Sequence, residues 1–96
     1  MRFDLDQPRA AYLVIADELE RAIRDGEIPA GTRVPSARRL ADMAGVSTRT
    51  SEAALRVLKE RQVTVSVHGK GTYPHPNLSS AAQGDGQEKS PDQSED

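Results

Sequence analysis

Residues 45–55 have the sequence Gly45-Val46-Ser47-Thr48-Arg49-Thr50-Ser51-Glu52-Ala53-Ala54-Leu55, which is typical of a sharp turn between two helices. Glycine readily adopts the positive φ that ends many helices, so we expect Gly45 to end the first helix. A serine hydroxyl accepts a hydrogen bond from a backbone amide in the first helical turn, so we expect Ser47 to cap the second. The segment predicts a helix-turn-helix.

Apolar residues on both sides of this turn follow helical spacing. Before the turn, Ser36 is the expected cap of a helix over residues 37–44, and its apolar stripe is predicted to contain Ala37, Leu40, Met43 and Ala44. After the turn, the side chains expected to point inward are Thr50, Ala54, Leu55 and Leu58. Those expected to point outward are Arg49, Glu52, Arg56 and Lys59. This outward side is predicted to meet the major groove of DNA.

A short hairpin is predicted after the second of these helices. Residues 63–67, Val-Thr-Val-Ser-Val, alternate with the period of a strand that has one buried side. The glycines of His68-Gly69-Lys70-Gly71 permit a tight turn, and a second strand at Thr72-Tyr73 completes the hairpin. The chain is therefore expected to be an α+β winged helix-turn-helix whose wing carries His68 and Lys70 at its tip.

Three further segments complete the expected organisation. Residues 1–9 are interpreted as an extended arm, and residues 10–76 as the winged helix-turn-helix domain. The domain begins with an amphipathic helix that ends at Gly26, and its apolar stripe contains Tyr12, Ile15, Ala16, Leu19, Ala22 and Ile23. A proline- and glycine-containing loop follows, with room for a short strand near Val34. Residues 77–96 are polar and acidic, and we predict a disordered tail.

Composition excludes several classes of function. The chain has no cysteine and two histidines, His68 and His75, so we expect no disulfide, thiolate nucleophile or zinc site. No phosphate-binding glycine loop or paired histidine and carboxylate motif is present, so we expect neither catalytic residues nor a cofactor. The sequence contains no long apolar run and does not begin like a signal peptide, which predicts a cytoplasmic, nucleoid-associated protein with no membrane partner.

Charge is unevenly distributed along the chain, although its overall formal charge is only −2. Residues 1–32 carry a net charge of −3, residues 33–76 of +5, and residues 77–96 of −4. The excess positive charge therefore coincides with the predicted helix-turn-helix and wing. A cationic surface releases counterions from DNA when it neutralises phosphates, although solvated helix faces give a similar distribution.

These motifs together resemble the N-terminal winged-helix domain of the GntR family of bacterial transcription regulators, over about Pro8 to Tyr73. The family's first pattern is matched by Tyr12, Gly26, Ile28, Gly31, Arg33, Val34, Pro35 and Ser36. Its helix-turn-helix pattern is matched by Leu40-Ala41, Gly45-Val46-Ser47 and Ala54-Leu55-Arg56-Val57-Leu58. Its wing pattern stands as Gly69-Lys70-Gly71-Thr72-Tyr73. The resemblance implies a DNA-binding regulator.

Two departures from the family pattern concern DNA contacts and control. The family usually has arginines at the positions of Arg38, Thr48 and Glu52, of which this chain keeps the first. Glu52 has two open interpretations: it reads a cytosine, or it pairs with Arg56 one helical turn later. Family members also normally continue into an effector-binding or dimerisation domain, whereas this chain ends in an acidic tail. We therefore expect no small-molecule effector site.

The leading functional interpretation is a sequence-specific DNA-binding protein, either a small transcriptional repressor or an architectural factor of a mobile element. Its expected partner is double-stranded DNA, and helix 10–25 with the arm is a candidate homodimer contact. The alternative is a protein-interaction module that has lost DNA readout and binds a protein partner. The residues expected to contact DNA are Ser36, Arg38, Ser47, Thr48, Arg49, Ser51, Glu52, Arg56, His68, Gly69, Lys70 and Gly71.

Overall fold

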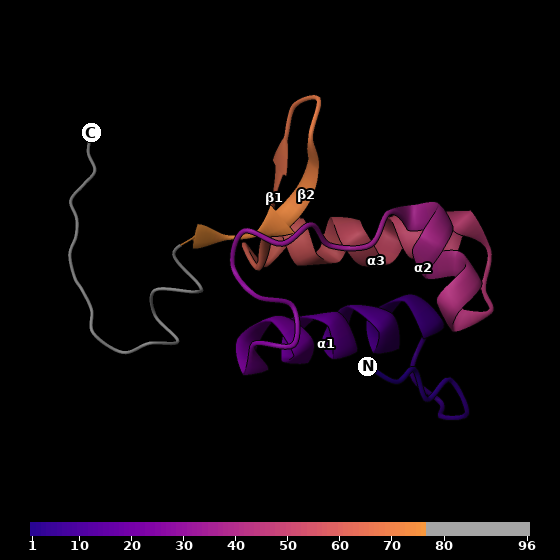
Figure 1. The fold of residues 1–96 in the computed structure, drawn as a ribbon. Coiled ribbons are helices and arrows are strands. Elements are labelled where there is room, and N and C mark those ends of the chain that lie inside the picture. The colour runs from indigo at the N-terminus through magenta and orange to yellow at the C-terminus, as the bar shows by residue number, and fades with distance from the viewer. Residues whose placement is uncertain (77–96) are drawn as a thin grey trace.

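The structure is a computed structural model that describes residues 1–76, and these residues form three helices and one two-stranded sheet (Figure 1). The elements are α1 (Ala11–Asp25), α2 (Ala37–Ala44), α3 (Thr48–Glu60), β1 (Thr64–Val67) and β2 (Gly71–Pro74). The winged helix-turn-helix prediction is confirmed in element order and type. The predicted disordered tail, residues 77–96, lies outside the described residues.

The helix-turn-helix is formed by the local interactions that the sequence predicted. The Ser36 hydroxyl accepts a hydrogen bond from the Arg39 amide at 3.2 Å, and the Ser47 hydroxyl accepts one from the Thr50 amide at 3.1 Å. Gly45 has φ 71° at the end of α2, a conformation that costs glycine little because it has no Cβ. α2 and α3 thereby pack against each other across a short turn.

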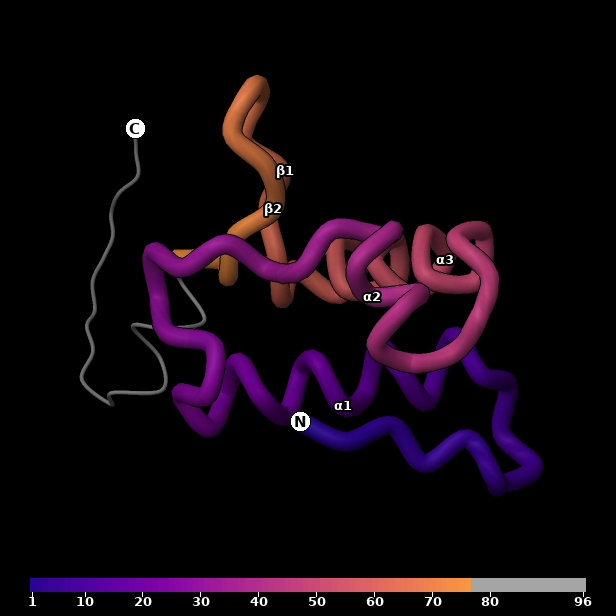
Figure 2. Tube along the Cα trace, turned by 45° about the vertical axis from the view of Figure 1, so that its right-hand side comes forward, coloured from indigo at the N-terminus to yellow at the C-terminus, as the bar shows by residue number. Residues whose placement is uncertain are grey.

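The core lies between α1 and the α2–α3 pair (Figure 2). Its largest fully buried side chains are Ile15, Leu19, Leu40, Leu58, Val34, Val63 and Ser51. The predicted burial is wrong for two residues, because Tyr12 is 37% exposed and Met43 is 44% exposed. Two residues outside the predicted stripes are also buried. Val14 is buried because the arm covers a second side of α1, and Ala41 is buried beside Leu40 where the short α2 packs on the core.

The wing is an antiparallel hairpin in which Thr64 pairs with Pro74 and Val67 with Gly71. The prediction that one side of residues 63–67 is buried is wrong. Val63 and Thr64 are buried at the base, whereas Val67 is 38% exposed. The hairpin projects from the helices, so no second layer covers its outer half (Figure 1). Burial in β1 therefore falls with distance from the core rather than alternating.

The arm and the loop before α2 both pack against regular elements. Residues 1–9 have no helix or strand and run back along α1, where the Arg2 amide donates to Glu18 at 3.1 Å and Phe3 and Leu5 contact the core (Figure 2). The loop around Val34 forms no strand, but the Val34 amide donates to the Thr72 carbonyl at 2.7 Å. The loop is thus hydrogen-bonded to the edge of β2.

Candidate nucleic-acid interface

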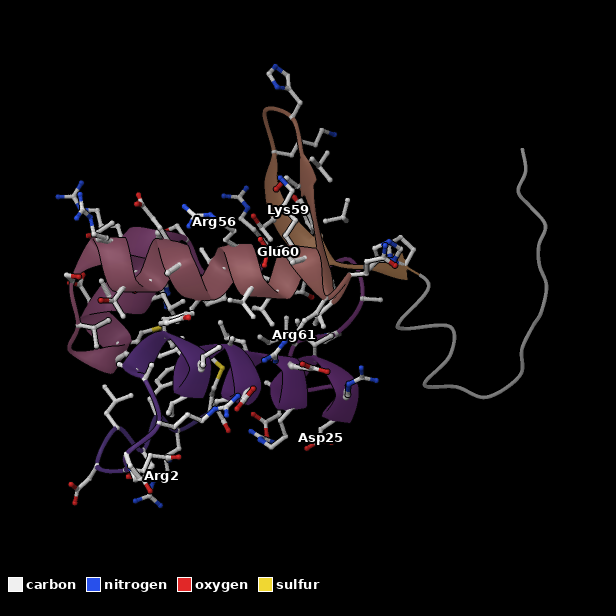
Figure 3. All side chains as sticks on the ribbon, turned by 180° about the vertical axis from the view of Figure 1, so that it is seen from behind. Arg2, Asp25, Arg56, Lys59, Glu60 and Arg61 are labelled. Carbon is white, nitrogen blue, oxygen red and sulfur yellow. The ribbon has the colours of Figure 1, made fainter. Side chains whose placement is uncertain are left out.

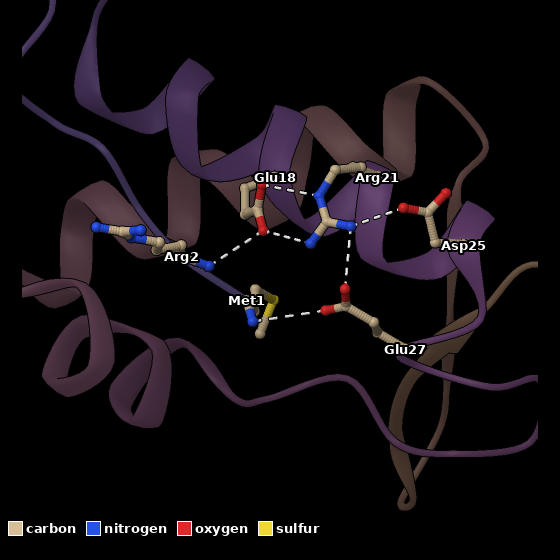
Figure 4. A network of polar contacts seen from close by, with 6 residues as sticks. All are labelled: Met1, Arg2, Glu18, Arg21, Asp25 and Glu27. Atoms are coloured by element: carbon tan, nitrogen blue, oxygen red, sulfur yellow. Dashed lines mark hydrogen bonds and ion pairs between the residues drawn. The ribbon is translucent and has the colours of Figure 1, made fainter.

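Carboxylates neutralise most of the arginines around α1. Arg21 is the centre of a network in which its guanidinium donates to Glu18 at 2.6 Å, Asp25 at 2.7 Å and Glu27 at 3.0 Å (Figure 4). The remaining ion pairs with α1 carboxylates are made by Arg9 with Asp17, Arg24 with Glu20, and Arg61 with Asp17 and Glu20. These cations are occupied by intramolecular partners.

The same network shifts the pKa values of its members. The hydrogen bond from Arg21 lowers the pKa of Glu18 below its ordinary value of 4.5, with the Arg2 amide contributing in the same direction. Arg21 likewise lowers the pKa of Glu27, and the carboxylates raise the pKa of Arg21, with Glu18 contributing most. The side of the molecule formed by α1 therefore holds most of its arginines in ion pairs and keeps a net excess of carboxylates.

The cations of α2, α3, the wing and the loop before α2 are exposed and unpaired within the described residues. We call this set the cationic face, and it consists of Arg33, Arg38, Arg39, Arg49, Arg56, Lys59 and Lys70. Within residues 1–76, none of these side chains forms an ion pair or hydrogen bond. Arg56 and Lys59 lie on the side of α3 away from α1, whereas Arg61 lies between the two helices (Figure 3). The positive charge predicted from the sequence is thus available to an anion.

An open groove separates α3 from the wing. Its lining consists of Glu52, Leu55, Arg56, Lys59, Thr64, Ser66 and Thr72. The groove therefore combines two cations and one carboxylate of α3 with hydroxyl groups of both strands. Glu52 and Arg56 form no ion pair within the described residues, so the structure does not support the interpretation that they pair along the helix.

Other predicted contact residues are also exposed. Thr48 and Arg49 lie exposed in the first turn of α3, and Arg38 lies exposed in α2. The capping hydroxyls of Ser36 and Ser47 are engaged with backbone amides, and the Ser47 hydroxyl lies 3.0 Å from the Thr50 hydroxyl. At the wing, residues 68–71 are exposed, and the Lys70 amide donates to the Val67 carbonyl at 2.9 Å to close the turn.

Ser51 was predicted to contact DNA, but it is buried in the structure. Its side chain is fully buried, so it does not face a base edge or a phosphate as expected. Ser51 lies three residues before Ala54 and seven before Leu58, both buried, which places it on the inward side of α3. Its hydroxyl oxygen has no hydrogen-bond partner within residues 1–76.

The sequence-based list of contact residues omitted three exposed cations. Arg39 and Lys59 lie exposed on α2 and α3, and Lys59 lines the groove. Arg33 lies in the loop next to the wing and was noted in the sequence only as a motif match. Helical spacing places Lys59 on the outward side of α3, so the sequence carries the signal for this residue. The position of Arg33 depends on a contact between distant segments, which no local pattern reports.

The described residues lack two other kinds of feature. Residues 1–76 contain no group of three or more His, Cys, Asp or Glu side chains arranged to hold a metal ion. The helices of this part of the chain are also too short or too polar to cross a membrane.

Comparison with known proteins identifies relatives of this domain. MngR of Escherichia coli (strain K12), the mannosyl-D-glycerate transport/metabolism system repressor, is 40% identical over 62 residues, which are 65% of this chain and 26% of MngR. The chain thus spans about a quarter of that relative's length. YtrA from Sulfolobus acidocaldarius, described as a GntR-family transcription factor, is 32% identical with a TM-score of 0.69, covering 76% of this chain and 77% of YtrA.

A solved complex with DNA is also similar. The DNA-binding domain of AraR in complex with operator ORR3 is 25% identical with a TM-score of 0.62, over 77% of this chain and 92% of that one. The family model described as bacterial regulatory proteins, gntR family, matches residues 11–73, which include all the helices, the helix-turn-helix and most of the wing. The chain therefore belongs to the gntR family of bacterial regulatory proteins.

Proposed function

We propose that this chain binds double-stranded DNA sequence-specifically and acts as a transcriptional repressor. The observation that carries the proposal is the separation of charge: most arginines around α1 are paired, whereas the cationic face has no intramolecular partners within residues 1–76. The repressor name of MngR and the operator complex of the AraR domain support it. Operator DNA in a bacterium lies in the cytoplasm, so the proposed location is the nucleoid.

The proposed binding mode places α3 in the major groove. Thr48, Arg49, Glu52 and Arg56 then face base edges or flanking phosphates, because they are exposed on successive turns of one helix. Arg38 and the backbone amides at the starts of α2 and α3 face phosphates, since a helix N-terminus favours an anion. His68, Gly69, Lys70 and Gly71 form the wing contact.

Glu52 is proposed to be a base-reading residue. A carboxylate is repelled by phosphates, so its presence among cations is productive only where it meets a hydrogen-bond donor. In the major groove the cytosine N4 amino group is such a donor. The unpaired state of Glu52 leaves its oxygens available for this contact.

The salt dependence of DNA binding tests the proposal. Each neutralised phosphate contributes a slope of about −0.9 to the logarithm of the association constant against the logarithm of salt concentration. We expect Arg38→Gln to weaken binding and to make the slope shallower. Arg24→Gln is the matched control, because Arg24 is exposed but paired with Glu20 on α1. A flat wild-type slope, or no binding at low salt by the folded protein, would favour the protein-interaction module.

A further inference from the structure

The side chain of Arg33 lies against the backbone of Gly71 at the start of β2. A Cβ atom built on Gly71 would stand 3.0 Å from Arg33 Cδ and 3.3 Å from both Cγ and Nε. Such distances are tighter than most Cβ contacts, so a side chain at residue 71 would press on Arg33, and the φ of 122° at this residue favours glycine independently. The contact joins residues that are far apart in the sequence.

The backbone next to Arg33 is held in place. Val34 is 1% exposed, and its amide donates to the Thr72 carbonyl at 2.7 Å. The loop before α2 is therefore hydrogen-bonded to β2 directly beside Gly71. The residue after Arg33, Val34, is buried in the core, and the aliphatic stem of Arg33 packs on the wing. The Arg33 side chain is therefore already restricted and would lose less conformational entropy on binding.

Glu27 lines the same pocket as Arg33, but its carboxylate pairs with Arg21 and the N-terminus rather than with Arg33. Arg33 is exposed and forms no ion pair or hydrogen bond within residues 1–76. Lys70, which immediately precedes Gly71, is also exposed and unpaired in that range. Arg33 thus packs on the residue that directly follows Lys70, so two exposed cations come from segments that lie side by side at the start of β2.

We propose that Arg33 is a phosphate-binding residue beside the wing and that the absence of a side chain at Gly71 leaves room for it. This inference rests on the proposed DNA-binding function and extends the interface to the loop before α2. The ligand is a backbone phosphate of duplex DNA, for which the planar guanidinium offers two parallel donors. The contact carries no base information, so it contributes affinity rather than sequence preference.

Arg33→Met tests the inference, because methionine keeps an apolar stem over Gly71 and removes the charge. The affinity for every duplex sequence is expected to fall by a similar factor, about tenfold at 0.1 M salt, with a salt slope shallower by about 0.9. Arg24→Met is the matched control and is expected to leave both quantities unchanged, since Arg24 is paired with Glu20 on α1. Thermal unfolding of each variant checks that the fold is retained.

Arg33→Lys supplies the second arm of the test. Lysine keeps the charge but lacks the two parallel donors of the guanidinium. The salt slope is therefore expected to return to the wild-type value, while part of the affinity loss remains. Wild-type affinity and slope in Arg33→Met would overturn the inference and make Arg33 a packing residue only. Absence of salt-dependent binding by the wild-type chain would instead overturn the proposed function, and the inference with it.

Discussion

Arg49 and Glu52 are exposed on adjacent turns of α3, and neither is neutralised within the described residues. Arginine binds guanine with two hydrogen bonds to O6 and N7, a contact that discriminates against other bases. Arg49→Ala is expected to cost about 1–3 kcal/mol of binding free energy and to relax the preference at one base pair. Competition binding against single-base variants of the site measures both. Equal weakening on every sequence would instead assign Arg49 to a phosphate.

Glu52 is expected to determine a cytosine in the bound site. Glutamine in its place prefers adenine, because the amide pairs with adenine N6 and N7, so Glu52→Gln is expected to change the favoured base from cytosine to adenine at one position. Glu60→Gln is the control, since Glu60 is also an exposed carboxylate of α3 without an ion pair in residues 1–76. The assignment fails if Glu52→Ala keeps the wild-type base preference at every position.

Ser51 is a buried hydroxyl without a partner in residues 1–76, directly beneath the exposed side of α3. Burial of an unsatisfied polar group costs about 1–3 kcal/mol, and alanine also favours a helix. Ser51→Ala is therefore expected to raise the free energy of unfolding by about 1 kcal/mol, measured by urea denaturation. Its salt slope for DNA binding should stay at the wild-type value. A loss of stability would show that the hydroxyl is satisfied.

At the scale of the elements, the network on α1 predicts a pH dependence. Its hydrogen bond from Arg21 lowers the pKa of Glu18 below 4.5, so this carboxylate stabilises the folded state above about pH 4.5. That stability is lost as the pH falls through the lowered pKa. Glu18→Gln is expected to lower the melting temperature slightly at pH 7 and to flatten the decline of the melting temperature as the pH falls below 4.5.

The matched control for this prediction is Asp42→Asn. Asp42 is an exposed carboxylate of α2 that makes no ion pair within residues 1–76. Its replacement should leave the melting temperature falling as steeply below pH 4.5 as in the wild type. If the melting temperature of Glu18→Gln also falls as steeply as that of the wild type, the Arg21–Glu18 hydrogen bond does not account for the acid dependence.

Elements that depend on local chemistry were predictable from the sequence. Ser36, Gly45 and Ser47 have the capping and turn roles that their residue types favour, because those interactions involve amides only a few residues away. The outward side of α3 also follows from helical spacing. The same spacing places Ser51 on the inward side of α3. The prediction that Ser51 contacts DNA was wrong because it followed from the polar residue type and not from the position on the helix.

Features that depend on contacts between elements were not predictable in the same way. Alternation in residues 63–67 indicated one buried side, but Val67 is exposed because the wing extends beyond the layer that would cover it. Tyr12 fits the apolar stripe of α1, yet the arm and the core cover neighbouring positions instead. Arg33 meets Gly71 only after the loop has folded onto β2.

At the scale of the whole molecule, charge is divided between an α1 side whose arginines are mostly paired with carboxylates, a cationic face and an acidic C-terminal segment. Residues 77–96 carry a net charge of −4 and lie outside the described residues. We expect this charge to compete with DNA for the cationic face. Deletion of residues 77–96 should tighten binding to random duplex at low salt, and the difference should vanish near 1 M salt, where charges are screened within about 3 Å. Unchanged low-salt affinity would refute the competition.

Selection of bound duplexes from a random DNA library with the purified chain tests the central claim, sequence-specific DNA binding, most directly. The account predicts enrichment of a defined site that contains a cytosine whose selection depends on Glu52. Two-fold symmetric half-sites about one helical turn apart would indicate a dimeric repressor, and direct repeats an architectural factor. A folded protein that enriches no sequence above the starting library would contradict the account.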